Sequence, residues 1–375
     1  MVAQGESMAD ALFNPDSVGQ LAAEFAAGVP GFDAARFARD ALAGFESRAL
    51  MARMEWLADC AQAQLSPEFA VMADQLEAAM PAPLDPDLTD DDFGHFIHAV
   101  PGILAVRHGL QDAPDRALDL LLAATQRFSM EFYIRDFINH WPEKTQARLI
   151  DWAQHDNYHV RRLVSEGTRP KLPWAKAITM STQARQPLLD ALQGDKTRYV
   201  TRSVANHLND LSKSEPDTVL QWLGAWQAGG QQDPKELGWM TKHALRTLIK
   251  QGHEGAMGHL GYHADAPIAV RATLQDTHVA MAQAVTFQVE IEASQTVPLL
   301  IDYRIRFARP GGKTSEKVFK LKQTEVHGGK PCVVKKAHKL KGGASTFTLH
   351  PGAHQIIVQV NGRDHATLDF DLTQT

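Results

Sequence analysis

The segment HVRRLVSEGTRPKLPW, which runs from His159 to Trp174, surrounds a single carboxylate with basic side chains. The carboxylate is Glu166, and the neighbours that carry or can take up a positive charge are His159, Arg161, Arg162, Arg169 and Lys171. Such a cluster permits two interpretations. Either Glu166 only pairs with its neighbours, or the cations hold a polyanion and the acid acts on it. The residue types alone leave both interpretations open.

A second acid, Glu131, lies in the stretch FSMEFYIRDFINHW, residues 128–141. Ser129 is suited to be a helix N-cap, which predicts Glu131 in the first helical turn, where the helix dipole favours a carboxylate. By itself this pattern is typical of an ordinary capping glutamate. Its interest depends on whether the fold brings Glu131 close to Glu166.

Trp174 differs from most of the seven tryptophans, which we expect in the core. It follows TRPKLP, a non-helical segment that leaves the end of the helix carrying Glu166. An aromatic ring on a loop beside a carboxylate and arginines can hold a cationic ring against its π face.

The motif HDNYH, residues 155–159, has the histidine spacing of the HExxH zinc signature, with aspartate in place of glutamate. Asp156 and Asn157 are both suited to begin the following helix, which would keep the two histidines off a shared helical face. The chain has no glycine-rich phosphate loop, and its two cysteines, Cys60 and Cys332, are too few for a zinc cluster. We therefore expect no metal, no nucleotide cofactor and no other cofactor.

The cluster around Glu166 belongs to a repeat with a period of 40 residues. The stretch HVRRLVSEG from His159 aligns with YVTRSVANH from Tyr199 and WMTKHALRT from Trp239. Helix pairs repeated at this interval are typical of HEAT solenoids, in which each pair buries its apolar face by stacking on the next. Because residues four apart share a helix face, the repeat predicts one polar stripe. The stripe would contain Arg162 with Glu166, Arg202 with Asn206, and Lys242 with Arg246.

Two regions of the chain differ in their hydrophobic pattern. Residues 8–260 have apolar side chains mostly at helical spacing, which predicts a mainly α, HEAT-like solenoid with an exposed Asp-rich loop at residues 80–92. Residues 265–375 alternate apolar and polar side chains between turns, which predicts a small antiparallel immunoglobulin-like β-sandwich of seven or eight strands. The stretches expected as strands are 268–275, 284–293, 298–308, 317–323, 345–350, 354–362 and 365–373.

Nine lysines lie between residues 313 and 341, and the stretch KKAHKLKGG, residues 335–343, is expected as a surface loop. A lysine-rich loop often does no more than keep a surface soluble. Beside a basic solenoid it is also a candidate contact for phosphate groups. The candidate residues are Lys335, Lys336 and Lys339.

The net charge of −6 conceals a strong asymmetry. Residues 1–130 hold 7 Lys/Arg against 20 Asp/Glu, a net of −13, which leaves 31 against 24, a net of +7, for the remainder. A basic half is typical of a protein that binds an anionic polymer, although proteins without such a partner show it too. The chain has no apolar stretch long enough to cross a membrane, and its N-terminus does not look like a secretory signal. With so few cysteines, we expect a cytoplasmic protein.

In the helical region around Glu131 and Glu166, the chain resembles the bacterial HEAT-repeat alkylpurine DNA glycosylases, and within them the AlkC type. The resemblance rests on four stretches within residues 8–260: FSMEFYIRDFI, WAQHDNYHVRRLVSEGTRPKLPWA, RYVTRSVANHLNDLSKSEP and KHALRTLIKQGHEGAM. The β region is similar to the immunoglobulin-like domain of a subset of AlkC proteins. One departure is Asp136, where the family pattern leads us to expect proline.

The resemblance implies a monofunctional glycosylase of base excision repair. It would hydrolyse the N-glycosidic bond of cationic alkylated bases, N3-methyladenine and N3-methylcytosine, in duplex DNA, without turning the lesion into a deep pocket. It also implies Glu131 and Glu166 as the catalytic carboxylates, with Trp174 beside the damaged nucleotide. Arg162 and Arg169 would hold the flanking backbone, in a protein that we expect to act as a monomer without cofactor or metal.

Two other hypotheses remain open at this point. In the first, the chain is a non-catalytic HEAT protein that binds DNA, and Glu166 only pairs with Arg162. In the second, it is a protein-interaction scaffold without affinity for DNA, since solenoids commonly serve this purpose.

Overall fold

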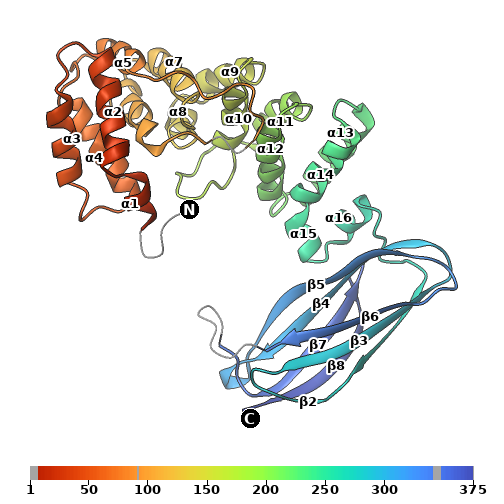
Figure 1. Cartoon of the computed structure of the whole chain (residues 1–375). Coiled ribbons are helices and arrows are strands. Elements are labelled where there is room, and N and C mark those ends of the chain that lie inside the picture. The colour runs from red at the N-terminus through yellow and green to blue at the C-terminus, as the bar shows by residue number, and fades with distance from the viewer. Residues whose placement is uncertain (1–6, 91–92, 341–347, 375) are drawn as a thin grey trace. The chain divides into compact units, whose positions relative to one another are not determined.

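The computed structural model describes residues 7–90, 93–340 and 348–374, with helices in the first part of the chain and strands in the last (Figure 1). The helical elements before the strands are α1 (Met8–Leu12), α2 (Pro15–Gly28), α3 (Ala34–Ala43), α4 (Leu50–Gln62), α5 (Phe69–Ala78), the 3-10 helix η1 (Phe96–Ala99), α6 (Val100–Leu104), the π-helical η2 (Ala105–Gly109), α7 (Pro114–Ala124), α8 (Ile134–His140), α9 (Pro142–Trp152), α10 (Tyr158–Gly167), α11 (Thr182–Leu192), α12 (Arg198–Leu211), α13 (Pro216–Gly229), α14 (Pro234–Ala244), α15 (Arg246–Lys250) and α16 (Glu254–His259). The strands, with one short 3-10 helix among them, are β1 (Ile268–Leu274), β2 (His278–Ala280), β3 (Ala284–Ala293), β4 (Val297–Ala308), η3 (Pro310–Gly312), β5 (Thr314–Val326), β6 (Cys332–Lys339), β7 (Gly352–Val360) and β8 (Arg363–Thr373).

The chain divides into two compact units. The first comprises Met1–Leu211 with Ala225–Ala244, and the second comprises Ser212–Gly224 with Leu245–Thr375. Each unit is described by itself below.

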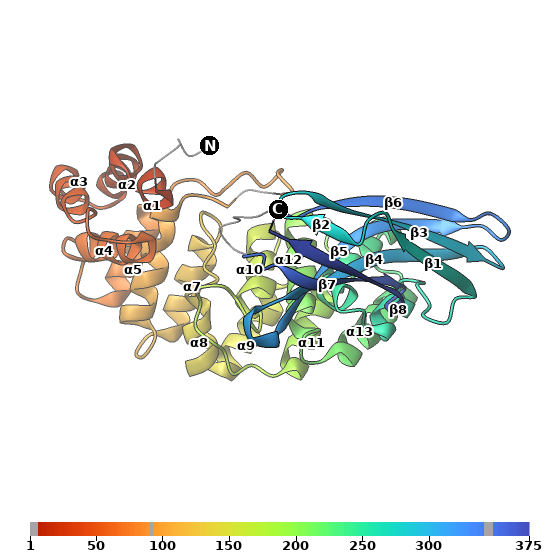
Figure 2. The same ribbon diagram turned by 90° about the horizontal axis from the view of Figure 1, so that it is seen from below.

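The 40-residue repeat corresponds to a stack of neighbouring helices in the first unit. Helix α10 packs against α12, and α12 packs against α14; Figures 1 and 2 show α10 and α12 side by side. The apolar positions that align in the repeat are all fully buried: Val160, Val164, Val200, Val204, Met240 and Ala244. Each helix therefore buries its apolar face against the next repeat, and the predicted HEAT-like solenoid is confirmed.

The last helix of the repeat, α14, ends before it reaches Arg246, the last residue of the predicted stripe. Helix α14 ends at Ala244, and Leu245, which leaves helical geometry, is fully buried. Arg246 begins the separate helix α15 and belongs to the second unit. The prediction that Lys242 and Arg246 share one helical face is therefore wrong, because the helix is interrupted at Leu245 between them.

Local sequence explains how α10 begins and where it ends. Asn157 is the N-cap, and its Oδ1 accepts a hydrogen bond from the backbone N–H of His159 at 2.8 Å. His155 precedes the cap, so the two histidines of HDNYH do not share a helical face, as the sequence predicts. At the other end, a Cβ on Gly167 would lie 2.5 Å from the side chain of Ile134. Glycine thus lets the end of α10 approach α8 closely.

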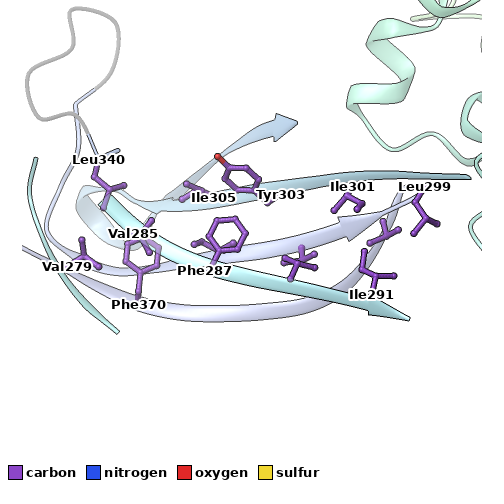
Figure 3. Packing of buried hydrophobic residues seen from close by; sticks show 14 of the residues in the cluster. Val279, Val285, Phe287, Ile291, Leu299, Ile301, Tyr303, Ile305, Leu340 and Phe370 are labelled. Atoms are coloured by element: carbon purple, nitrogen blue, oxygen red, sulfur yellow. The ribbon is translucent and has the colours of Figure 1, made fainter. Parts of the chain in front are cut away.

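The β region forms two sheets with a shared core. One sheet has the strand order β1-β3-β6 and the other β2-β8-β7-β4-β5, and all pairs are antiparallel except β2 with β8. Alternate residues of β3 point inward: Phe287 packs against Tyr303 of β4, and Ile291 lies near Leu299 and Ile301 of the same strand (Figure 3). The strands predicted within 268–308, at 317–323 and within 354–373 are confirmed.

Two predictions in the β region are wrong. Of the expected strand at residues 345–350, residues 348–350 are not in a strand, and 345–347 lie outside the described residues. Lys335, Lys336 and Lys339, which are expected on a loop, lie instead on β6, an edge strand paired with β3; residues 341–343 lie outside the described part. Charged side chains are common on edge strands because they oppose pairing with other chains, and here they conceal the strand pattern.

Candidate functional site

Arg162 joins the two acids that the sequence singles out. Its Nη1 lies 2.7 Å from Glu131 Oε2, and its Nη2 lies 3.7 Å from Glu166 Oε2. Arg169 contacts the other oxygen of Glu166, with Nη1 at 2.5 Å from Oε1. Glu131 and Glu166, 35 residues apart in the chain, therefore meet at one guanidinium group.

Glu131 reaches this cluster from a turn that precedes α8. The helix begins at Ile134, and Tyr133 occupies the N-cap position, so the prediction that Ser129 caps this helix is wrong. The hydroxyl of Ser129 instead donates to Glu131 Oε2 at 2.7 Å and lies 3.0 Å from Nη1 of Arg162. Because its hydroxyl contacts both Glu131 and Arg162, Ser129 helps to hold the Glu131 carboxylate beside the guanidinium group.

Glu166 lies in the last turn of α10 and is only 5% exposed. Ser203 of α12 donates a hydrogen bond to its Oε2 at 2.6 Å. Burial by itself would raise the pKa of Glu166, but the charges of Arg162 and Arg169 and the bond from Ser203 outweigh burial and lower it. The carboxylate therefore stays ionised. Its pairs with the arginines are buried, so removing one partner costs more free energy than it would in the exposed pair expected from the sequence.

Arg162 is itself buried in an aromatic setting. Its guanidinium carbon lies 4.5 Å from the centre of the Tyr199 ring, and Tyr199 packs edge-on against Phe93. Burial alone would lower the pKa of Arg162, but the neighbouring Glu131 and Glu166 raise it above its ordinary value. The arginine is held as a permanent cation between two carboxylates and a ring.

The cluster contains one further acid, so the predicted stripe is not uniformly basic. Arg169 Nη2 lies 2.8 Å from Asp210 Oδ2, so two guanidinium groups meet three carboxylates. One repeat further on, Arg202 pairs with Asp90. Asn206 Oδ1 lies within hydrogen-bond distance of His243 Nε2, at 2.9 Å. Sequence reasoning missed Asp210, although it continues the four-residue spacing of Arg202 and Asn206 along α12.

Trp174 projects from the loop that follows α10, which is anchored to α8 by hydrogen bonds from Arg135. The side chain is 74% exposed, and its backbone has φ of 62°, a left-handed conformation that is unusual for a bulky residue. Arg135 of α8, which is fully buried, donates from Nη1 to the carbonyls of Gly167 and Arg169 at 3.0 and 2.9 Å, and from Nε to that of Lys176 at 2.6 Å. Sequence reasoning missed this anchor, because an arginine inside an apolar helix pattern has no local signal.

The remaining predicted contacts for DNA lie on exposed or half-exposed positions. Lys171, Lys242 and Arg246 are exposed, as are Lys335 and Lys339 on one face of β6, whereas Lys336 is half-buried on its other face. Among the described residues, no three His, Cys, Asp or Glu side chains are grouped so that they could hold a metal ion. None of the helices in the described part of the chain is long and apolar enough to span a membrane.

Fold and site together define a solenoid of helical repeats, with a largely buried cluster of acids and arginines, that continues into an immunoglobulin-like β domain. Residues 269–374 match a family model described as "Uncharacterised protein YhaZ, C-terminal Ig-like domain". The uncharacterized protein YhaZ of Bacillus subtilis (strain 168) is 32% identical over 262 residues, which cover 69% of this chain and 72% of that protein.

A solved structure resembles nearly the whole chain. It is that of the Pseudomonas fluorescens alkylpurine DNA glycosylase AlkC bound to DNA containing an abasic site analog. That protein is 30% identical, with a TM-score of 0.80, and the match covers 96% of this chain and 98% of the other. This chain therefore belongs to the YhaZ family, whose fold is that of the AlkC-like alkylpurine DNA glycosylases.

Proposed function

We propose that this protein is a DNA glycosylase that hydrolyses the N-glycosidic bond of N3-methyladenine and N3-methylcytosine in duplex DNA. The observation that carries the proposal is the convergence of Glu131 and Glu166 on the guanidinium of Arg162, in a fold shared with AlkC. The proposal includes Glu131 and Glu166 as the catalytic carboxylates and Trp174 as the aromatic beside the damaged nucleotide.

The chemistry of a cationic base explains why carboxylates would suffice. A base that already carries a positive charge is a good leaving group, so no general acid is needed. As the bond breaks, positive charge develops on the sugar, and an ionised carboxylate held close to it stabilises that charge and can orient the attacking water. The lowered pKa of Glu166 supports this role, because the group remains an anion at neutral pH.

The arginines would bind phosphate groups of the DNA backbone. Arg162 and Arg169 each contact carboxylates of the cluster in the absence of DNA. Guanidinium groups also bind phosphate strongly, so a phosphodiester placed at this cluster would compete for them. Any guanidinium contact that moves from Glu131 or Glu166 to phosphate leaves that carboxylate free to face the developing cation.

The proposal is tested by incubating methylated duplex DNA with the protein and identifying the bases released. We expect release of N3-methyladenine and N3-methylcytosine by the wild type, and a loss of about 100-fold or more in Glu131→Gln and in Glu166→Gln, as is usual for a group that stabilises a transition-state charge. Glu236→Gln is a matched control, because Glu236 also pairs with an arginine, Arg198, at 2.5 Å in the next repeat.

The results also separate the competing functions. No release by the wild type would end the enzyme proposal. Salt-sensitive binding of DNA that survives both carboxylate substitutions, without release, would indicate a non-catalytic DNA-binding protein. Absence of DNA binding at low salt would favour a protein-interaction scaffold.

A further inference from the structure

A cavity of about 170 Å³ lies in the first unit beside Trp174. Its walls come from α4, from α6 with η2, from the start of α8, and from the loop at residues 174–176. We propose that this cavity is a product site, which takes up the free, uncharged base after it leaves the DNA. Its identity as a product site rests on the proposed glycosylase function, whereas its affinity for a planar heterocycle does not.

Two unusual backbone features meet at this cavity. Trp174 holds a left-handed conformation at φ of 62°, and the opposite wall includes Val106 and Arg107 of the π-helical segment η2. Strained single residues and short π-helical segments both occur preferentially at functional sites, where the surrounding structure maintains them. Arg135 anchors the backbone on both sides of Trp174, through the carbonyls of Gly167, Arg169 and Lys176.

The size and lining of the cavity suit a flat ring system. Phe132, Tyr133 and Trp174 supply aromatic surface, and Ile103 and Val106 supply aliphatic surface. Aromatic side chains bind planar rings by stacking or edge contacts. A volume of 170 Å³ is below the roughly 300–1,000 Å³ of sites for drug-sized ligands, so the cavity fits a base and not a nucleotide.

The charges at the rim favour an uncharged ligand. Glu55 pairs with Arg107 at 2.5 Å, and Asp136 pairs with Lys176 at 2.6 Å, so each lining carboxylate has a cation beside it. The lining residues thus carry no net charge that would offset the desolvation of a cationic base. A neutral ring gains the apolar contacts without that cost.

The proposed reaction supplies such a neutral ring. When the bond between the ring nitrogen and C1′ of the sugar breaks, both electrons stay on the nitrogen, so a base that was cationic in DNA leaves uncharged. The positive charge passes to the sugar, water adds there, and the proton of that water goes to a carboxylate or to solvent. The wall of the cavity includes Phe132, the residue after Glu131, so the same turn of the chain contributes to the cavity and to the proposed catalytic cluster.

The experiment titrates free N3-methyladenine into the full-length protein and measures binding by ligand-observed NMR, in the absence of DNA. Val106→Phe fills the cavity from η2, and Ala175→Leu fills it from the loop. Val71→Phe is the control, because Val71 is an exposed valine on α5 and is not part of the cavity wall. We expect saturable binding to the wild type and to Val71→Phe, and binding at least tenfold weaker in both filled variants.

A second readout follows base release from methylated DNA. Free N3-methyladenine should inhibit repeated turnover by the wild type, and the filled variants should resist this inhibition. Their first turnover should stay within about threefold of the wild type, because Glu131 and Glu166 are unchanged.

Wild-type protein that does not bind the free base, or filled variants that bind it as tightly as the wild type, would overturn the product site. Binding of the base without any release from DNA would instead leave the cavity standing and overturn the glycosylase proposal.

Discussion

At the scale of single residues, the cluster is arranged so that each charge has a partner before any ligand arrives. Arg162 and Arg169 meet Glu131, Glu166 and Asp210, and Ser203 donates to Glu166 at 2.6 Å. Such pairs are costly to break one partner at a time, because the group left behind stays buried and unpaired. The charge state of Glu166 therefore depends on its immediate neighbours.

Ser203→Ala should shift the pH dependence of base release. Ser203 helps to hold the pKa of Glu166 below its ordinary value, so its loss raises that pKa. A carboxylate loses its charge as the pH falls through its pKa, so the variant should lose activity at a higher pH than the wild type. At neutral pH the rate should fall by about 10- to 150-fold at most, since a hydrogen bond to a charged group contributes about 1.5–3 kcal/mol and about 1.4 kcal/mol is a tenfold change in rate.

Ser203→Thr, which keeps the hydroxyl, is the control and should restore the wild-type pH profile. Parallel pH profiles for Ser203→Ala and the wild type, differing only in height, would show that Ser203 does not act through the ionisation of Glu166.

Sequence reasoning identified Glu131, Arg162, Glu166 and Arg169, and the structure brings these four together. It did not identify Ser203 or Asp210. The reason is that a repeat alignment compares equivalent positions, whereas Glu166 contacts a residue from the next repeat that is offset from its own equivalent, Asn206.

At the scale of elements, two loops of the first unit determine how the cluster is presented. The loop after α10 carries Arg169 and Trp174 and is attached to α8 by Arg135. The loop before η1 runs beside α7 and α12, with the backbone of Leu84 bonded to Gln126 and that of Thr89 to Tyr199.

Arg135→Met should loosen the loop after α10. The substitution leaves one buried and two part-buried carbonyls without their donor, at a cost of about 1–3 kcal/mol for a buried unsatisfied group, so we expect the free energy of unfolding to fall by about 3 kcal/mol. Chemical denaturation measures this change, and limited proteolysis should cut faster within residues 168–177.

Arg148→Met is the matched control, because Arg148 pairs with Asp119 at the surface and should contribute less than about 1 kcal/mol. Equal destabilisation by the two substitutions would show that Arg135 does not anchor the loop.

The Asp-rich loop should reduce the affinity for DNA. The sequence predicts this loop only as an exposed segment. In the structure, Asp90 of the loop pairs with Arg202. Asp91 and Asp92 lie outside the described residues. Asp90→Asn removes a carboxylate that competes with phosphate for this arginine. An exposed ion pair contributes about 0.2–1 kcal/mol, so DNA should bind about two- to fivefold more tightly, as measured by fluorescence anisotropy at low salt.

Asp87→Asn removes an equal charge from the same loop and is the control. An equal gain in affinity for both variants would indicate a general charge effect, and weaker binding by Asp90→Asn would contradict the predicted competition.

At the scale of the whole molecule, charge is distributed unevenly along the chain. The first 130 residues carry −13 and the remainder +7. In the β domain, Lys335 and Lys339 are exposed on one face of β6, while Lys336 pairs in register with the core residue Phe287 and lies on the other face.

Replacing both Lys335 and Lys339 by alanine should weaken the salt dependence of DNA binding. Each lysine that contacts a phosphate adds about −0.9 to the slope of log K against log salt, so the slope should become shallower by about 1.8. Lys336→Ala should leave the slope unchanged. A slope that is the same in the double variant and in the wild type would show that this face of β6 does not contact the backbone.

The fold was predictable to different degrees in the two regions. The repeated apolar positions, such as Val160 and Val200, identified the solenoid because helices of successive repeats bury the same positions. Strand β6 was missed because its lysines mask the alternation, and the end of α14 was missed because the interruption at Leu245 has no signal in the local pattern. Edges and ends depend on long-range packing, which a local pattern does not contain.

The central claim is that two carboxylates, Glu131 and Glu166, promote loss of a cationic base from DNA. Its most direct test is the first-turnover rate of N3-methyladenine release, measured with enzyme in excess and at concentrations that saturate the DNA, for the wild type and for Glu131→Gln/Glu166→Gln. We predict that the double variant binds the DNA within about fivefold of the wild type and releases base at least 100-fold more slowly, because the charge that stabilises the developing cation is lost. Saturation of the DNA removes any contribution of affinity to this rate. Release by the double variant at the wild-type rate would contradict the account.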